Sequence, residues 1–265
     1  MNNNSIGVFD SGLGGLTVVK AIRKLLSSES LLYFGDTARL PYGSKSPETV
    51  ISSSKQVVNF LIQRDIKLMV VACNSATAMA LPVLLEMTSI PIIGVIEPGA
   101  KAAVDISKSN HIGVIGTHAT IHSGAYNSAI KEINPNCIVT EQPCPLFVPL
   151  VEEGWADHPI ASEIAKEYLQ TFNESFVDVV ILGCTHYPLM KKIIKESLNK
   201  NVKLVDSATS VANEIKRILE KNNLLAENAD PTIKYFVTDF PQKFEELGKR
   251  FIGKDLKEVS LANID

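Results

Sequence analysis

The sequence predicts an α/β fold of two domains, each built on a parallel sheet, with the functional site in the cleft between them. Short apolar, β-branched runs alternate with helical patterns, which is typical of parallel sheets whose strands are joined by helices. The predicted strands are SIGVF, LLYF, LMVVAC, PIIGVI, HIGVI, CIVTE, VDVVIL, VKLV and KYFV. A chain of 265 residues is long enough for two domains of ordinary size.

An internal repeat supports the two-domain interpretation. IGVFDSG at 6–12 resembles IGVIGTH at 112–118, and VVACNSA at 70–76 resembles VILGCTH at 180–186. Each half therefore carries one strand-end loop and one cysteine in equivalent places, as expected of a tandem duplication. The alternative is chance similarity between buried strands, which often share Ile, Gly and Val.

One helix between strands is clearly signalled. Ser46 can cap it and Pro47 suits its first position. At helical spacing, one face gathers the apolar residues Val50, Val57, Val58, Leu61 and Ile62.

Composition excludes several classes of partner. The net charge is −3, from 26 basic and 29 acidic residues, and no basic stripe marks a primary nucleic-acid partner. The chain has neither a secretory leader pattern nor an apolar run of roughly 18 residues, so we expect a cytoplasmic protein without a membrane span. The four cysteines lack CxxC spacing, so we expect reduced thiols, with Cys137 and Cys144 as small core residues.

The other two cysteines occupy a position suited to chemistry. Cys73 and Cys184 each end an apolar strand and precede a helix, at the sheet edge where open α/β folds bind ligands. The two residues after each cysteine are expected at a helix N-terminus, where free N–H groups favour anions such as a substrate carboxylate. The same position is expected to lower a thiol pKa from about 8.5 towards neutrality.

Two thiols in matched settings suit the inversion of a stereocentre. Without a cofactor, one group must remove a proton from one face while another delivers a proton to the opposite face. Hydrogen bonds and dipoles aimed at the substrate carboxylate would stabilise the carbanion. The duplication therefore predicts a two-base reaction between facing domains.

Six motifs in order, from residue 6 to about 210, resemble those of the glutamate racemases in the aspartate/glutamate racemase superfamily. They are FDSGLGG (9–15), GDTARLPYG (35–43), ACNSAT (72–77), GVIGTHAT (113–120), CPLFVPLVEEG (144–154) and GCTHYPL (183–189). The resemblance implies a two-domain racemase that needs no cofactor or metal and makes D-glutamate for peptidoglycan. Ser75 stands where the family more often has Thr, and both keep a hydroxyl.

The resemblance also implies roles for individual residues. Cys73 would act on the α-proton of the D-enantiomer, assisted by Asp10, and Cys184 on that of the L-enantiomer, assisted by His186 and Glu152. Motif alignment alone favours this glutamate over its neighbour, Glu153. The implied substrate contacts are Asp10, Ser11, Pro41, Tyr42, Gly43, Asn74, Ser75, Thr77, Thr117, Thr120, Thr185 and His186.

For the domains, we expect residues 1–96 with 208–265 in the first and 97–207 in the second. The segment 234–253, KYFVTDFPQKFEELGKRFIG, is predicted to return to the first domain as a strand and an amphipathic helix. The oligomeric state stays open, with a homodimer as one alternative.

Other functions have weaker support. The SGLGGLT turn is similar to a dinucleotide loop, but Thr17 stands where the third glycine of that motif belongs. A zinc protein lacks local ligand spacing. An amino-acid-binding module would have no reason to keep two thiols, and aspartate racemase is the nearest enzymatic alternative.

Overall fold

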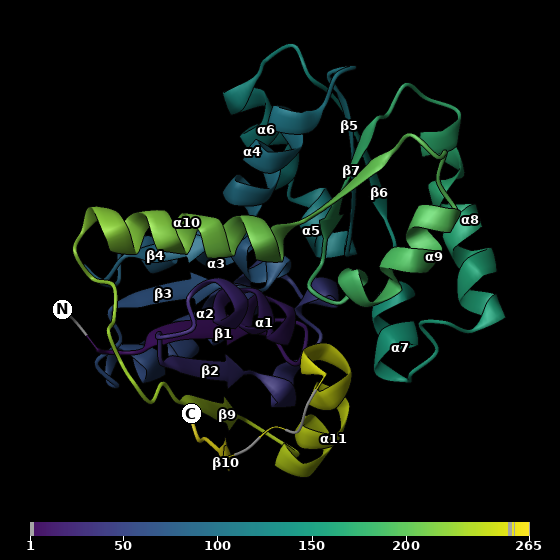
Figure 1. Cartoon of the computed structure of the whole chain (residues 1–265). Helices are drawn as coiled ribbons and strands as arrows, with labels where there is room; N and C mark the ends of the chain where they lie inside the picture. Colours follow the sequence, from purple (N-terminus) through teal and green to yellow (C-terminus); the bar gives the residue numbers. More distant parts are fainter. Residues whose placement is uncertain (1–2, 254–255, 257, 265) are drawn as a thin grey trace.

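The computed structural model describes residues 3–253, 256 and 258–264, and its strands form two separate sheets (Figure 1). The first sheet has the order β10-β9-β2-β1-β3-β4 and the second β6-β5-β7-β8. All of the neighbouring strands run parallel. The predicted fold of two parallel-sheet α/β domains is confirmed.

The strand bounds follow the predicted apolar runs closely. In the first sheet they are β1 (Ile6–Asp10), β2 (Leu31–Gly35), β3 (Leu68–Val71), β4 (Ile92–Gly94), β9 (Ile233–Val237) and β10 (Val259–Leu261). In the second they are β5 (His111–Gly116), β6 (Ile138–Pro143), β7 (Val179–Gly183) and β8 (Lys203–Asp206).

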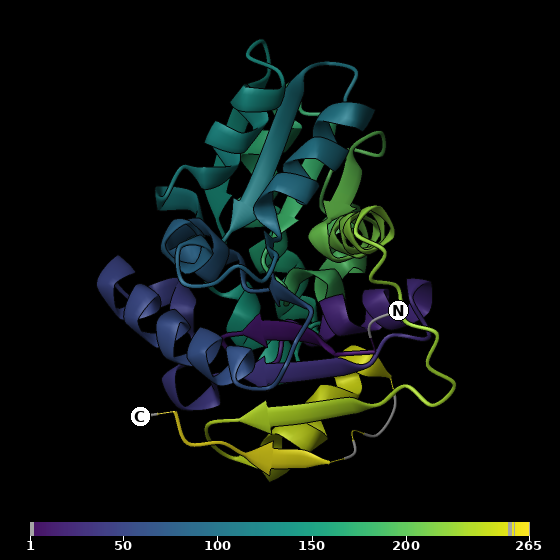
Figure 2. The same ribbon diagram turned by 90° about the vertical axis from the view of Figure 1, so that its left-hand side faces the viewer.

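Both sheets share one strand order. In the first, β1 lies between β2 and β3 with β4 beyond β3, and in the second, β5 lies between β6 and β7 with β8 beyond β7. The repeated sequence motifs fall on the paired strands β1 and β3 and on the paired strands β5 and β7. β9 and β10 extend the first sheet at its outer edge (Figure 2). This correspondence supports the predicted duplication.

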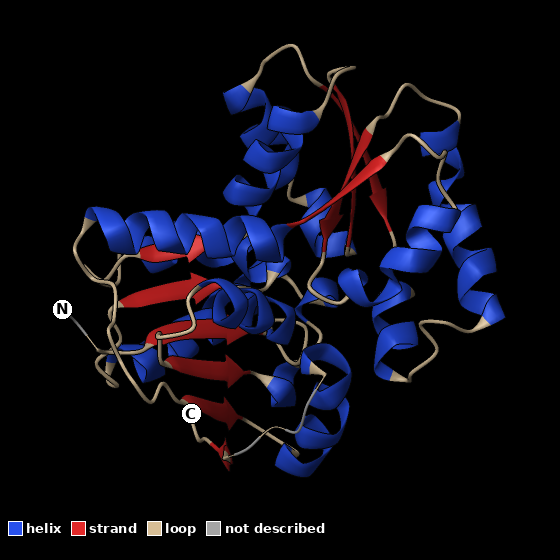
Figure 3. Cartoon of the chain, viewed as in Figure 1, coloured by secondary structure: helices blue, strands red, loops and turns tan. Residues whose placement is uncertain are grey.

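Helices cover both faces of each sheet (Figure 3). Around the first sheet lie α1 (Leu16–Leu25), α2 (Pro47–Ile62), α3 (Asn74–Leu85), α10 (Ser207–Lys221) and α11 (Pro241–Ile252). Around the second lie α4 (Ile96–Ile106), α5 (His118–His122), α6 (Ala125–Ile133), α7 (Phe147–Glu152), α8 (Pro159–Asn173) and α9 (Lys191–Glu196). Short 3₁₀ helices complete the chain: η1 (Thr37–Arg39), η2 (Tyr42–Ser44) and η3 (Tyr187–Met190). Among the described residues, no helix is both long and apolar enough to cross a membrane.

Two local predictions are confirmed. Ser46 caps α2 by accepting the Thr49 N–H, and Pro47 is the first helical residue. Apolar side chains of this helix pack on the first sheet. The C-terminal segment forms β9, which pairs with β2, followed by α11.

The two domains meet through side chains at the carboxyl ends of their strands. The Ser75 and Thr117 hydroxyls lie 3.0 Å apart. A Cβ at Gly14 would lie 2.0 Å from the Thr185 hydroxyl, so only glycine fits this contact. The predicted boundaries, 1–96 with 208–265 and 97–207, remain a prediction, and each sheet lies within one of these parts.

Candidate active site

Cys73 lies just after β3 and caps α3. Its sulfur accepts the Ala76 N–H at 3.5 Å, and its thiol donates to the Ser11 hydroxyl at 3.6 Å. Cys73 is only 6% exposed. Its predicted place, at a strand end and a helix N-terminus, is confirmed.

Asp10, the last residue of β1, is fully buried close to this thiol. One carboxylate oxygen accepts the Gly12 N–H at 3.0 Å, and the other accepts the Thr185 hydroxyl of the second domain at 3.4 Å. Burial raises the pKa of Asp10, and nearby His186 and these hydrogen bonds offset the rise only in part. The carboxylate therefore depends on both domains for its partners.

The thiol of Cys73 is neutral in this arrangement. Burial, together with the Asp10 carboxylate, raises the pKa of Cys73 to about 12. The expectation that the helix N-terminus lowers this pKa is therefore wrong here. Desolvation of a thiolate outweighs the hydrogen bonds with Ala76 and Ser11. A neutral thiol is the form that donates a proton.

Cys184 follows β7 and has different partners. Its sulfur lies 3.9 Å from Nδ1 of His186, and Nε2 of His186 lies 3.1 Å from a carboxylate oxygen of Glu152. Burial alone would lower the pKa of His186, but the contacts with Cys184 and Glu152 raise it to about 10. A protonated imidazole favours negative charge on the neighbouring sulfur. The residues that follow form the 3₁₀ helix η3.

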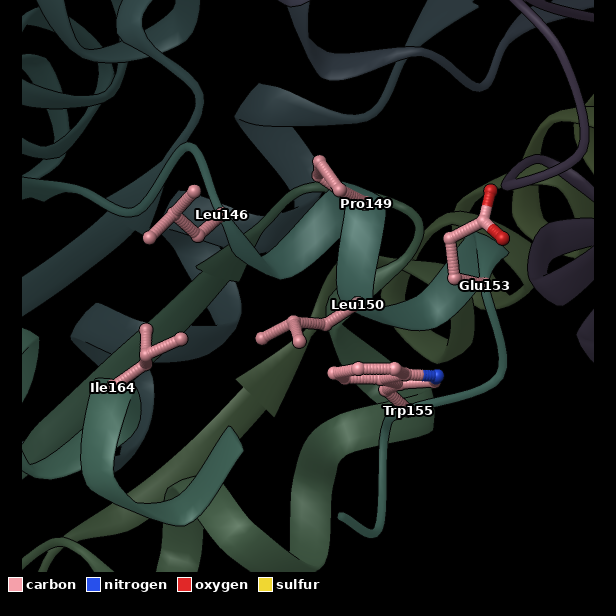
Figure 4. A pocket seen from close by; sticks show the side chains of 6 residues that line it. All are labelled: Leu146, Pro149, Leu150, Glu153, Trp155 and Ile164. Atoms are coloured by element: carbon pink, nitrogen blue, oxygen red, sulfur yellow. The ribbon is translucent and has the colours of Figure 1, made fainter. Parts of the chain in front are cut away.

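Two adjacent glutamates at the end of α7 have separate surroundings. Glu152 contacts His186, whereas Glu153 lines an apolar groove on the same domain. Figure 4 shows this groove, which is lined by Leu146, Pro149, Leu150, Glu153, Trp155 and Ile164. The geometry therefore favours Glu152 as the partner of His186.

A buried polar cluster adjoins the first thiol. The Ser75 hydroxyl lies 3.0 Å from that of Thr117 and 3.2 Å from that of Thr120. The side-chain oxygen of Asn74 accepts the Tyr126 hydroxyl at 2.7 Å. Its amide nitrogen is buried and has no hydrogen-bond partner in the described part of the chain. An unpaired buried donor indicates a ligand that accepts hydrogen bonds, such as a carboxylate.

The η2 turn closes against this cluster. Tyr42 is buried, and its hydroxyl donates to the Asp36 carboxylate, which fixes the ring. A Cβ at Gly43 would lie 2.6 Å from the Thr117 side chain, so glycine permits this close contact between domains. The predicted residues Tyr42 and Gly43 thus lie at the edge of the site.

Two further predicted contacts have different surroundings. Pro41 is exposed. The Thr77 hydroxyl donates to the Val71 carbonyl and accepts the Val95 N–H, so it is used in backbone support.

Three supporting residues were missed by sequence reasoning. They are Asp36, which holds Tyr42, Tyr126, which holds Asn74, and Tyr33, whose hydroxyl donates to the Gly12 carbonyl at 2.8 Å. Asp36 lies within the GDTARLPYG motif, which is the one available signal. The tyrosines carry no such signal because their bonds join distant parts of the chain.

The donor set does not resemble a metal centre. In the described residues, no group of three or more His, Cys, Asp or Glu side chains could hold a metal ion. All four cysteines of the chain are free thiols.

The fold and site define a class of protein: two α/β domains with the same strand order that bury a pair of thiols, each with its own polar partners. Residues 6–215 match the family model described as Asp/Glu/Hydantoin racemase, and the chain belongs to this family. The resemblance predicted from the sequence motifs is confirmed.

Full-length relatives support this assignment. The chain is 51% identical to a glutamate racemase from Geobacter metallireducens, over 98% of this chain and 97% of that protein. A glutamate racemase isoform from Bacillus anthracis has the same fold, with a TM-score of 0.96 and 40% identity, over 99% and 98% of the two chains. A glutamate racemase from Francisella tularensis, solved in complex with D-glutamate, gives a TM-score of 0.95 and 39% identity, over 100% and 99%.

The protonation of His186 leads to a prediction about stability. Its stabilising contribution should be complete below about pH 6.5 and disappear as the pH rises through its folded pKa of about 10, because deprotonation weakens the contacts with Cys184 and Glu152. Urea unfolding of the wild type and of His186→Asn between about pH 6 and about pH 10 measures the contribution of His186 to the free energy of unfolding. The difference between their unfolding free energies should shrink with rising pH. A constant difference would contradict a protonated His186.

Proposed function

We propose that this chain is a glutamate racemase that interconverts L- and D-glutamate by proton transfer between two thiols, without a cofactor. The observation that carries the proposal is the pair of buried thiols at equivalent strand ends, Cys73 in one domain and Cys184 in the other. The names of relatives that match almost the whole chain support glutamate over aspartate as the substrate.

In the L-to-D direction, Cys184 is the base. His186, held by Glu152, favours the thiolate that removes the α-proton of L-glutamate. Cys73, a neutral thiol, then donates its proton to the opposite face of the carbanion. In the D-to-L direction the roles reverse, with Asp10 assisting the ionisation of Cys73.

The polar cluster binds the substrate's charged groups. The substrate's carboxylates accept hydrogen bonds from the backbone N–H groups at the N-terminus of α3 and from the side-chain amide of Asn74. The hydroxyls of Thr117 and Thr185 are further donors. The Asp10 carboxylate attracts the ammonium group. These donors also stabilise negative charge as the α-proton leaves.

The family resemblance supports a wider context for this activity. The enzyme acts in the cytoplasm and supplies D-glutamate for peptidoglycan synthesis. Its two domains comprise residues 1–96 with 208–265 and residues 97–207.

The direct test of the activity is circular dichroism of L- and D-glutamate, and then L- and D-aspartate, incubated with purified protein. Both glutamate enantiomers should racemise, and activity should survive removal of pyridoxal phosphate and treatment with a metal chelator, because the proposed acid and base are protein thiols. Loss of activity on chelation, or racemisation of aspartate alone, would contradict the proposal.

Replacement of each thiol tests the division of labour. Cys73→Ser and Cys184→Ser should each nearly abolish racemisation, because a serine hydroxyl is far less acidic than a thiol. An analogue with a leaving group at Cβ needs only deprotonation to eliminate. Cys184→Ser, which keeps Cys73, should therefore eliminate from the D-form, and Cys73→Ser should eliminate from the L-form.

The readout is release of the leaving group from each enantiomer. If both variants process the same enantiomer, or if either racemises glutamate at nearly the wild-type rate, one of the two cysteines is structural.

A further inference from the structure

The end of α11, which packs with the first domain, contacts the two residues that accompany the second thiol. Arg250 donates from Nη1 to the backbone oxygen of Glu152 at 3.1 Å. The Phe251 ring lies edge-on to the imidazole of His186, with centroids 5.5 Å apart and planes at 89°. Two consecutive residues of α11 thus contact the second domain. Arg250 binds the backbone of Glu152, and Phe251 packs on the side chain of His186.

The Arg250 bond completes the last turn of α7. A helix leaves its final carbonyl groups without partners inside the helix. Backbone N–H groups of residues 153–155 satisfy the carbonyl oxygens of residues 149–151. The next carbonyl, that of Glu152, accepts the guanidinium, and a cation at this end also suits the helix dipole. Glu152, whose carboxylate contacts His186, is therefore anchored from the other domain.

Gly154 makes room for this anchor. Its φ is +79°, a conformation that favours glycine. A Cβ at this position would lie 2.7 Å from Nη1 of Arg250. The turn after α7 is thus shaped both to reverse the chain and to admit the guanidinium.

Phe251 restrains the imidazole of His186 through the edge-on contact between the two rings. The two ring nitrogens of His186 already face Cys184 and Glu152. Phe251 is only 3% exposed, so its position is fixed by the packing of α11. Cys73 differs, because its partners Asp10 and Ser11 come from its own domain.

We propose that Arg250 and Phe251 are positioning residues for proton transfer by Cys184. This inference rests on the proposed two-thiol function. Arg250 fixes the end of α7 that carries Glu152, and Phe251 fixes the plane of His186. Contact between α11 and the second domain therefore acts directly on the partners of Cys184, whereas Asp10 and Ser11 come from the same domain as Cys73.

The test measures the rate of elimination by each thiol alone, using glutamate analogues that carry a chlorine atom at Cβ. In Cys73→Ser, Cys184 takes the α-proton of the L-analogue. The C–H electron pair becomes the Cα=Cβ bond, and the C–Cl bond breaks to release chloride. In Cys184→Ser, Cys73 does the same with the D-analogue. The rate of chloride release reports each half-reaction.

Arg250→Ala should slow chloride release from the L-analogue in Cys73→Ser by about tenfold or more, because small misplacements of catalytic groups are costly. It should leave release from the D-analogue in Cys184→Ser unchanged. Arg250→Lys keeps a charged donor and should restore most of the lost rate, and Phe251→Leu should act in the same direction as Arg250→Ala. Arg217→Ala, which removes an exposed guanidinium paired with Glu214, is the matched control and should change neither rate.

Thermal unfolding of each variant verifies that the fold is intact. Equal slowing of both half-reactions, or an unchanged L-analogue rate in Arg250→Ala, would overturn the positioning role. Absence of chloride release from both parent variants, seen before Arg250 is altered, would overturn the two-thiol function and this inference with it.

Discussion

The complete burial of the Asp10 carboxylate is the constraint on which the rest of the site depends. A carboxylate removed from water is costly unless polar groups surround it. The turn after β1 supplies the Gly12 N–H, and the second domain supplies the Thr185 hydroxyl. A Cβ at Gly15 would lie 2.6 Å from the Cβ of Asp10, so this turn needs glycine to approach the carboxylate. Burial of Cys73, together with this neighbouring carboxylate, raises the pKa of the first thiol.

The duplicated fold places the two thiols at equivalent strand ends, but their hydrogen-bond partners differ. Cys73 donates to the Ser11 hydroxyl and lies near the buried carboxylate of Asp10, whereas Cys184 contacts His186. The first environment raises the pKa of its thiol, whereas in the second the imidazole of His186 lies 3.9 Å from the sulfur. The two thiols therefore share a position in the duplicated fold but not an electrostatic environment.

The sequence predicted the features that depend on local pattern. The strand-end cysteines and the Ser46 cap follow from residues close together in the chain. Contacts such as Tyr126 with Asn74 and Arg250 with Glu152 join distant segments, and no periodicity reveals them.

The predicted lowering of the Cys73 pKa was wrong for a related reason. A helix N-terminus can be identified from sequence, but desolvation depends on how tightly the folded chain packs around the sulfur. Pro41 and Thr77 stay predictions as substrate contacts: Pro41 is exposed, and the Thr77 hydroxyl bonds to the backbone.

In the proposed reaction, different thiols serve the two faces of the substrate. The most direct measurement is the isotopic content of both enantiomers at an early stage of the reaction of L-glutamate in D₂O, by chiral separation and mass spectrometry. The first D-glutamate should carry deuterium at Cα while the remaining L-glutamate keeps protium, because the proton lost to Cys184 is replaced by a deuteron from Cys73, whose thiol has exchanged with the solvent. Early deuterium in the recovered L-glutamate, or protium retained in the product, would contradict two separate thiols and indicate that one group serves both faces.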